Sequence, residues 1–272
     1  MEGGFNKLPQ VVIDRFLSLA GGRDAAIVLI PTAIPDGRSQ QQPMSQQIEL
    51  FESALGSTHV TVLHTRDRAV ADSEAFTTPL RSAGGVWIMG GQVPLLAETY
   101  VGTRTQRELQ ALRDRGGVIG GDSAGAEIQG AMVLNPPNEV RRNPAGPFGG
   151  ASPGATSRAS ANQEQEIYPG LTGFDFLQNV IVIPHVIQRH QEGRIAEAGA
   201  QHPGMLSVGI DVGCALVVHG DSFDVIGVSK ALIPTHSGNN TGLETLLSGD
   251  RFDLVKRVKL GGLGSQDLRV SY

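Results

Sequence analysis

Residues 117–131 read GVIGGDSAGAEIQGA, and this stretch decides how the chain folds around its site. The short apolar segment 117–120 predicts a strand, and residues from about Ala124 onward predict a helix. Between them Gly121, Ser123 and Gly125 form the pattern G-x-S-x-G, which predicts a nucleophile elbow in this strand–turn–helix context. The glycines remove side chains that would collide in so sharp a turn. The alternative is a phosphate- or cofactor-binding glycine turn that contains a serine by chance.

The rest of the first half alternates strand and helix signals around this stretch. Helices are expected at 8–20, 44–55 and 100–115, and strands at 25–30, 60–63 and 86–89. Strands that alternate with helices of this length are typical of a parallel, doubly wound sheet. We therefore expect an α/β fold, a mostly parallel sheet flanked by helices.

The second half has a different character. Residues 140–170 are rich in Gly, Pro, Ser, Ala and Asn without periodicity, which is typical of a functional loop. A strand is expected at 179–183 and a helix at 192–200, followed by short strands at 209–211, 215–218, 223–228 and 254–260. These C-terminal strands are expected to be antiparallel and to pack on the α/β core. No linker demands a division, so residues 1–272 are predicted to form a single domain.

Composition excludes several classes of protein. Of 272 residues, 40% are hydrophobic and 18% charged, unlike a disordered chain. No apolar run reaches the length of about 18 residues that a membrane helix needs. The net charge of −5 argues against a nucleic-acid partner. The single cysteine, Cys214, lies among apolar residues and is expected to be a buried small side chain. No signal peptide is visible, so a cytoplasmic protein is expected, unless a leader is missing from the sequence.

A serine hydroxyl needs a base within hydrogen-bond reach, and His185 is the favoured one of seven histidines. It follows the predicted strand at 179–183, at the carboxyl end, where open α/β sheets place their ligands. His190 is expected on a polar face, and no third ligand at a recognisable spacing supports a metal site with these two histidines. The turn Gly90-Gly91-Gln92 follows another strand, and its N–H groups either hold an oxyanion or form an ordinary turn.

Together these motifs resemble a known family. The segment GGDSAGAEIQG, with WIMGGQ upstream and IPHVIQRHQEGRI downstream, is similar to serine peptidase family S51, which contains cyanophycinase and dipeptidase E. AGGRDAAIVLIPTA and GIDVGCALVVHGDSFDVIG extend the resemblance over nearly the whole chain. It implies a fold like that of class I glutamine amidotransferases, no metal or cofactor, a homodimer, and cleavage of short peptides or of isopeptide bonds beside aspartyl residues.

The resemblance also implies roles for individual residues. Ser123 matches the nucleophile and His185 the general base. Gly91 and Ala124 match the backbone donors of the oxyanion hole, and Gln92 matches a substrate-binding glutamine.

The third member of the triad is less well defined by the sequence. The family places a carboxylate some fifteen to eighteen residues beyond the serine, and Glu139 is the acid near that distance. It would orient the imidazole, as acids do in other triads. Glu127 and Asp211 stay open as alternatives.

Departures from the family concern the substrate. Arg189 and Arg194 match two of three pocket arginines, which suit the bidentate binding of carboxylates. Gln191 stands where the middle arginine is expected, and Ile183-Pro184 precede the histidine in place of an acidic pair. These changes weaken the case for the β-Asp-Arg polymer. The resemblance also implies a strand ahead of Glu2-Gly3-Gly4 that this sequence does not show.

Two other functions remain open at this stage. An esterase of the α/β-hydrolase class shares G-x-S-x-G, but no histidine-glycine-glycine oxyanion loop precedes the elbow. A non-catalytic binding protein on the same scaffold is compatible with the altered pocket residues. A serine peptidase acting on small peptides or isopeptides is the favoured interpretation.

Overall fold

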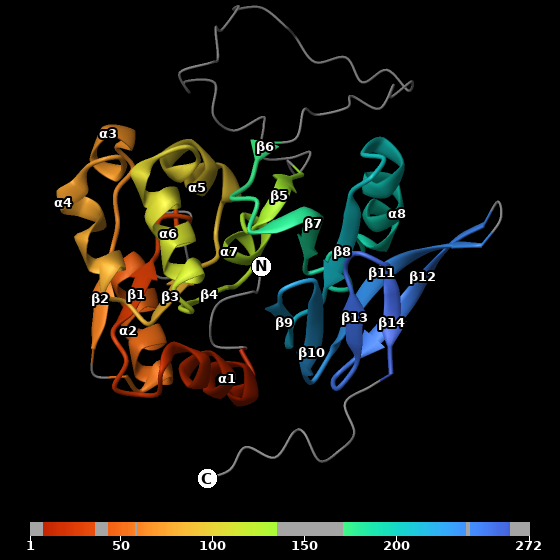
Figure 1. The fold of residues 1–272 in the computed structure, drawn as a ribbon, viewed down its shortest axis with the longest axis horizontal. Coiled ribbons are helices and arrows are strands. Elements are labelled where there is room, and N and C mark those ends of the chain that lie inside the picture. The colour runs from red at the N-terminus through yellow and green to blue at the C-terminus, as the bar shows by residue number, and fades with distance from the viewer. Residues whose placement is uncertain (1–7, 36–42, 58, 135–170, 238–239, 262–272) are drawn as a thin grey trace, which may run out of the picture.

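The first half of the chain forms a parallel four-stranded sheet in the order β2-β1-β3-β4. The computed structural model describes residues 8–35, 43–57, 59–134, 171–237 and 240–261 (Figure 1). The strands are β1 (Ile27–Ile30), β2 (Val60–Val62), β3 (Gly85–Ile88) and β4 (Val118–Gly121). β1 and β3 are buried along their whole length, as expected for strands covered on both faces.

Helices cover both faces of this sheet. α1 (Gln10–Ala20) and α2 (Met44–Leu55) share one core with alternate residues of β1 and with Trp87. The other face packs against α3 (Arg68–Ala71), a 3-10 turn (Thr78–Arg81), α5 (Val93–Tyr100) and α6 (Arg104–Asp114). A short helix, α4 (Glu74–Thr77), lies between α3 and the 3-10 turn. Alternation of side chains across each strand sends successive residues to opposite cores.

The second half contributes two further sheets. The six-stranded sheet has the order β12-β11-β8-β7-β5-β6, in which β5, β7 and β8 are parallel and the other pairs antiparallel. The antiparallel sheet has the order β14-β13-β10-β9. Their bounds are β5 (Gly130–Val133), β6 (Leu171–Thr172), β7 (Leu177–Pro184), β8 (Leu206–Ile210), β9 (Cys214–His219), β10 (Ser222–Gly227), β11 (Lys230–Ser237), β12 (Asn240–Leu247), β13 (Arg251–Asp253) and β14 (Val258–Leu260). Two helices complete this half, α7 (Ala124–Glu127) and α8 (Glu192–Gln201).

The predicted fold class is confirmed, but two details of the second half are corrected. The hairpin β11–β12 was not expected, because Pro234 and the polar residues around the turn hide its alternation. The single strand expected at 254–260 is instead a turn followed by β14. Asp253 Oδ1 accepts the N–H groups of Val255 and Lys256, which closes that turn.

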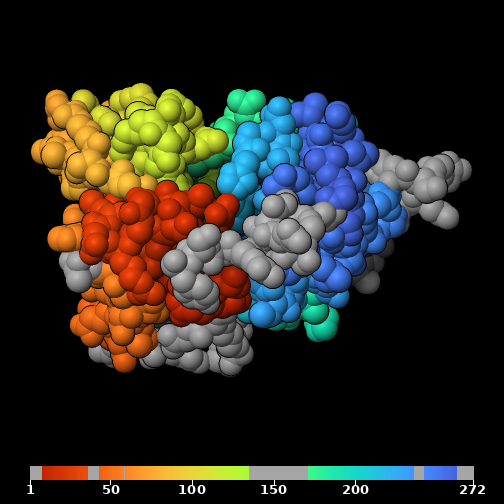
Figure 2. Space-filling model, turned by 60° about the horizontal axis from the view of Figure 1, so that its bottom comes forward, coloured from red at the N-terminus to blue at the C-terminus, as the bar shows by residue number. Residues whose placement is uncertain are grey.

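The two halves meet along a shared core. Figure 1 shows β1–β4 and their helices on one side and β7–β14 with α8 on the other. Ala215 and Ile226 of the antiparallel sheet pack against the core that contains α1 and Trp87. Figure 2 shows the two halves in contact along one boundary. Within the described ranges, no helix is long and apolar enough to cross a membrane.

Candidate active site

The turn between β4 and α7 holds Ser123 in a strained backbone conformation. Its φ of 52° and ψ of −117° lie where L-residues are rarely found. Gly125 allows this turn to press on β3, because a Cβ there would lie 1.9 Å from the carbonyl oxygen of Ile88. A Cβ on Gly121 would lie 2.4 Å from the carbonyl oxygen of Gly125. The two glycines of the pattern are therefore required by close backbone approach.

The structure brings Ser123 and His185 together. The Nε2 atom of His185 lies 2.8 Å from Ser123 Oγ, within hydrogen-bond distance. His185 follows β7 and has a φ of 60°, so both partners have left-handed backbones at strand ends. Its side chain is buried, with 8% of the residue exposed. The sequence predicted this pair, although the two residues lie 62 positions apart.

Burial sets the protonation state of this histidine. Burial and, to a smaller extent, the positive charge of Arg189 lower the pKa of His185 to about 4, against the opposing effect of the negative charge of Asp211. The imidazole is therefore neutral near pH 7. A neutral imidazole is able to accept a proton from the serine hydroxyl.

Of the two candidate carboxylates that the structure describes, Asp211 shares a cavity with Ser123 and His185. Its Oδ2 accepts a 2.6 Å hydrogen bond from Ser229 Oγ. Its Oδ1 is buried and has no hydrogen-bond partner in the described part of the chain. Glu127 instead lines a separate small cavity beside Arg189. Glu139 lies outside the described residues.

The turn after β3 lies directly against the elbow. A Cβ on Gly90 would be 2.9 Å from Ser123 Cβ, so no side chain fits between them. Gly91 has a φ of 147°, and a Cβ there would be 2.1 Å from the carbonyl oxygen of Ala33. That same oxygen accepts the N–H of Gln92 at 2.7 Å. The turn expected to supply an oxyanion donor thus has a fixed backbone next to the serine.

The other two expected site residues on this side differ in exposure. Ala124 begins α7 and is 2% exposed, so it adds its backbone N–H next to the serine without a bulky side chain. Gln92 is exposed at the start of α5.

Asp122 is a site residue that sequence reasoning did not single out. Its Oδ1 accepts the Nε1–H of Trp87 at 2.9 Å, and its Oδ2 accepts the backbone N–H of Gly90 at 3.2 Å. Burial raises its pKa to about 6, against the opposing effect of these donors. The available signal was an acidic residue inside a glycine-rich turn that follows a buried strand.

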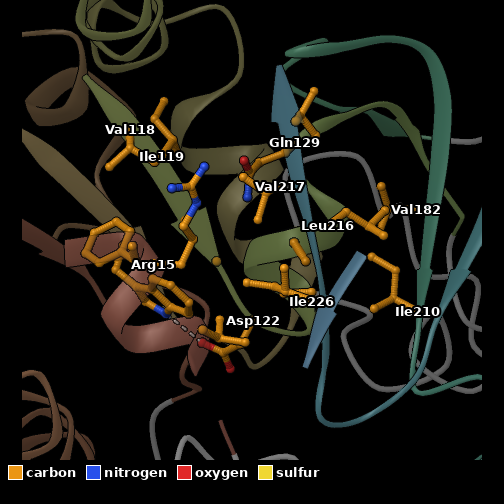
Figure 3. A pocket seen from close by; sticks show the side chains of 18 of the residues that line it. Arg15, Val118, Ile119, Asp122, Gln129, Val182, Ile210, Leu216, Val217 and Ile226 are labelled. Carbon is orange, nitrogen blue, oxygen red and sulfur yellow. Dashed lines mark hydrogen bonds between the residues drawn. The ribbon is translucent and has the colours of Figure 1, made fainter. Parts of the chain in front are cut away.

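A cavity of about 510 Å³ separates β4 from β9. Figure 3 shows Arg15, Val118, Ile119 and Asp122 on one side and Val182, Ile210, Leu216 and Ile226 on the other. Ser123 and His185 belong to its wall. β4 is the edge strand of the first sheet, and its residues line this cavity together with Val182 and Pro184 of β7.

The two arginines expected to bind substrate lie around a second, smaller cavity of about 20 Å³. Arg194 is half-buried and donates to Gln191 Oε1 at 3.3 Å, while Arg189 is exposed. Glu127 lies in the same wall. In the part of the chain that the structure describes, no cluster of His, Cys, Asp and Glu is suited to a metal ion. Cys214 is buried, as expected, and burial raises its pKa to about 12.

Known proteins are similar to this chain over most of its length. Residues 3–136 match the model of peptidase family S51. A cyanophycinase of Trichormus variabilis is 28% identical over 269 residues, which cover 92% of this chain and 82% of that protein. One from Geminocystis herdmanii is 26% identical over 271 residues, covering 93% and 91%.

A solved structure shares the fold. The peptidase from an acI-B1 actinobacterium superposes with a TM-score of 0.64 at 22% identity, over 90% of both chains. The family match covers the elbow itself, and the relatives extend the similarity through the second half. The chain belongs to peptidase family S51, a family of serine-type peptidases.

Proposed function

We propose that this serine-type peptidase hydrolyses small peptides or aspartyl isopeptides through an acyl-enzyme formed on Ser123. The observation that carries the proposal is the 2.8 Å contact between Ser123 Oγ and His185 Nε2 on a strained elbow. A hydroxyl and a neutral, buried imidazole at this distance form the pair that nucleophilic catalysis requires.

The reaction follows from the positions of these groups. His185 Nε2 takes the proton of Ser123 Oγ as the oxygen attacks the scissile carbonyl. The backbone N–H groups of Gly91 and Ala124 hold the oxyanion that develops. His185 then returns the proton to the leaving amine as the C–N bond breaks, which leaves the acyl-enzyme. Water, deprotonated by His185, attacks the ester and releases the acid and free Ser123.

We assign the supporting carboxylate to Asp211. Its negative charge acts on His185, and its buried Oδ1 has no partner among the described residues. An anion there stabilises the imidazolium formed during attack. Glu127 is less suited because it lines the other small cavity. The sequence-based choice, Glu139, stays a prediction.

Arginine chemistry supports a substrate with a carboxylate. Arg189 and Arg194 lie on the segment that follows His185, and both line the same small cavity. A guanidinium binds a carboxylate in two places at once, which suits an aspartyl residue or a free C-terminus. The relatives named cyanophycinase match over most of the chain. The homodimer, the single-domain organisation and the cytoplasmic location stay predictions.

A panel of substitutions tests this mechanism. Ser123→Ala and His185→Gln are expected to lower kcat on α- and β-aspartyl dipeptides by at least about 10³-fold, because each removes a group that forms or breaks bonds. Asp211→Asn is expected to lower kcat less than either. Ser82→Ala, at an exposed serine after the 3-10 turn, is the matched control and should match the unmodified enzyme.

A fluorophosphonate probe separates the competing functions. Labelling of Ser123, lost in Ser123→Ala, indicates an activated hydroxyl. Neither labelling nor turnover would favour a binding protein on this scaffold. Hydrolysis of p-nitrophenyl acyl esters without any hydrolysis of peptides would favour an esterase. Peptide turnover that survives in Ser123→Ala would overturn the mechanism.

A further inference from the structure

We propose that Asp122 is a positioning residue, whose carboxylate holds the Gly90–Gly91 turn against the elbow and so fixes the oxyanion donor of Gly91. The inference rests on the proposed function for its effect on turnover. The contacts themselves are independent of any substrate.

Both carboxylate oxygens of Asp122 bind the strand and turn that lead to Gly91. Oδ1 accepts the Nε1–H of Trp87 within β3 (dashed line at Asp122, Figure 3). Oδ2 accepts the N–H of Gly90 in the turn after β3. The backbone N–H of Asp122 donates to the carbonyl oxygen of Ile88 at 3.2 Å. One residue thus joins the end of β4 to the end of β3 at three points, and its chain neighbour is Ser123.

The partners of Asp122 are themselves closely packed. The indole of Trp87 lies between Phe16, whose ring centroid is 5.1 Å away, and Phe51, at 5.5 Å. Gly90 has no room for a side chain, since a Cβ would come within 2.6 Å of Asp122 Oδ2. The carboxylate therefore fills the space between a fixed indole and a fixed turn. Removing or neutralising it loosens the turn at Gly90 before it affects the sheet.

The charge state of Asp122 decides whether both bonds exist. An ionised carboxylate accepts at both oxygens, whereas a protonated one turns a donor toward one of the two N–H groups. Burial raises the pKa of Asp122 to about 6, while the bonds from Trp87 and Gly90 act in the opposite direction. The turn is therefore expected to loosen as the pH falls below about 6.

Other titratable and charged groups share the wall of this cavity. They are Arg15 on α1, Arg113 and Asp114 on α6, His185 after β7, Asp211 and Cys214 before and within β9, and His219 at its end. His185 has a pKa of about 4, and Cys214 one of about 12, so neither titrates near pH 6. Substitution of Asp122 itself is needed to assign a transition near pH 6.

The chain offers a direct probe of the contact, because Trp87 is its single tryptophan. Its indole N–H gives one resonance in a ¹⁵N-correlated NMR spectrum of the substrate-free protein. We expect this resonance and the Gly90 amide to shift with a midpoint near pH 6. The transition should vanish in Asp122→Asn and persist in Asp114→Asn. Asp114 lies in the same cavity wall, and its Oδ1 accepts a hydrogen bond from the side chain of Gln110.

Kinetics then test what the contact does for turnover. Asp122→Asn is expected to lower kcat by about 10- to 100-fold with little change in KM, because the oxyanion bond is made in the transition state. In the same variant, the pH below which kcat/KM falls should move from about 6 to about 4, the pKa of His185. Trp87→Phe removes one donor that lowers the Asp122 pKa. In this variant kcat/KM should therefore begin to fall at a higher pH than in the unmodified enzyme. Asp114→Asn should leave kcat and the pH dependence of kcat/KM unchanged.

The outcomes are distinguishable. A Trp87 resonance that does not titrate near pH 6, or that titrates identically in Asp122→Asn, overturns the proposed contact whether or not the protein is an active peptidase. If the resonance titrates as expected while kcat, and the pH below which kcat/KM falls, are unchanged in both Asp122→Asn and Trp87→Phe, the role in catalysis is overturned. Absence of turnover in the unmodified protein refutes the proposed function, and the NMR titration still decides the contact. If Asp122→Asn does not fold, Trp87→Phe carries the test.

Discussion

At the scale of single residues, Ser123 combines a reactive hydroxyl with an unfavourable backbone. Its φ of 52° with ψ of −117° is a region that glycine enters far more readily than other residues. Ser123→Gly should therefore unfold at a higher temperature than Ser123→Ala, by the equivalent of about 1–2 kcal/mol, although neither turns over substrate. Thermal unfolding followed by circular dichroism measures the difference.

A helical serine provides the control for this comparison. Ser18 lies exposed within α1, where alanine is favoured over glycine by about 1 kcal/mol. The order of stability should therefore be reversed, with Ser18→Ala more stable than Ser18→Gly. The same order at both positions would show that strain at Ser123 does not govern its stability.

Sequence reasoning predicts residues whose role follows from a local pattern. Ser123 and His185 were predicted from their positions after buried strands, and the structure places them in contact. Asp122 and Asp211 depend on neighbours that no local pattern reveals. The partners of Asp122 are Trp87 on β3 and Gly90 in the turn that follows it, 35 and 32 positions earlier. Asp211 accepts a hydrogen bond from Ser229, just before β11, and its charge acts on His185, which follows β7.

At the scale of elements, the elbow depends on the close approach of α7 to β3. Gly125→Ala would place a Cβ 1.9 Å from the Ile88 carbonyl oxygen, so α7 must shift and carry Ser123 with it. We expect a loss of turnover and a destabilisation on the order of 3 kcal/mol, measured as a lower urea midpoint. Gly193→Ala on α8 meets nothing within 4 Å and should stabilise the protein slightly. Equal effects at both positions would contradict this account of the elbow.

The elements themselves were predicted to different degrees. Continuous apolar runs predicted β1, β3 and the buried part of β7, residues 180–183, because such runs are typical of strands covered on both faces. The antiparallel strands were harder. β11 contains Pro234, and β12 mixes polar and apolar residues, so neither shows clean alternation. The division into three sheets could not be predicted from the sequence, because it depends on whether β4 pairs with a further strand beyond β3.

At the scale of the whole molecule, His185 and Asp122 have opposite effects on stability between about pH 4 and 6. The pKa of His185 is lowered to about 4, so its contribution to stability is lost as the pH falls from 6.5 toward 4. The pKa of Asp122 is raised to about 6, so its contribution is lost as the pH rises from 3.8 toward 6. In the unmodified protein these two contributions oppose each other.

Each substitution should therefore expose the effect of the remaining group. In Asp122→Asn, the free energy of unfolding should rise between pH 4 and 6.5, by on the order of 2–3 kcal/mol. In His185→Gln it should fall over nearly the same range. Urea denaturation at several pH values provides the measurement. Parallel pH profiles in the two variants would refute the assigned pKa shifts.

The hydrogen bond between Ser123 and His185 joins the two halves of the chain, since one partner follows β4 and the other follows β7. A displacement of one half by little more than an ångström breaks this bond, whereas the strand pairing within each sheet is kept. The enzyme is therefore expected to lose activity in mild denaturant at concentrations where its far-UV circular dichroism spectrum is still that of the native protein. Loss of hydrolysis thus reports a displacement of the two halves at a lower denaturant concentration than loss of secondary structure does.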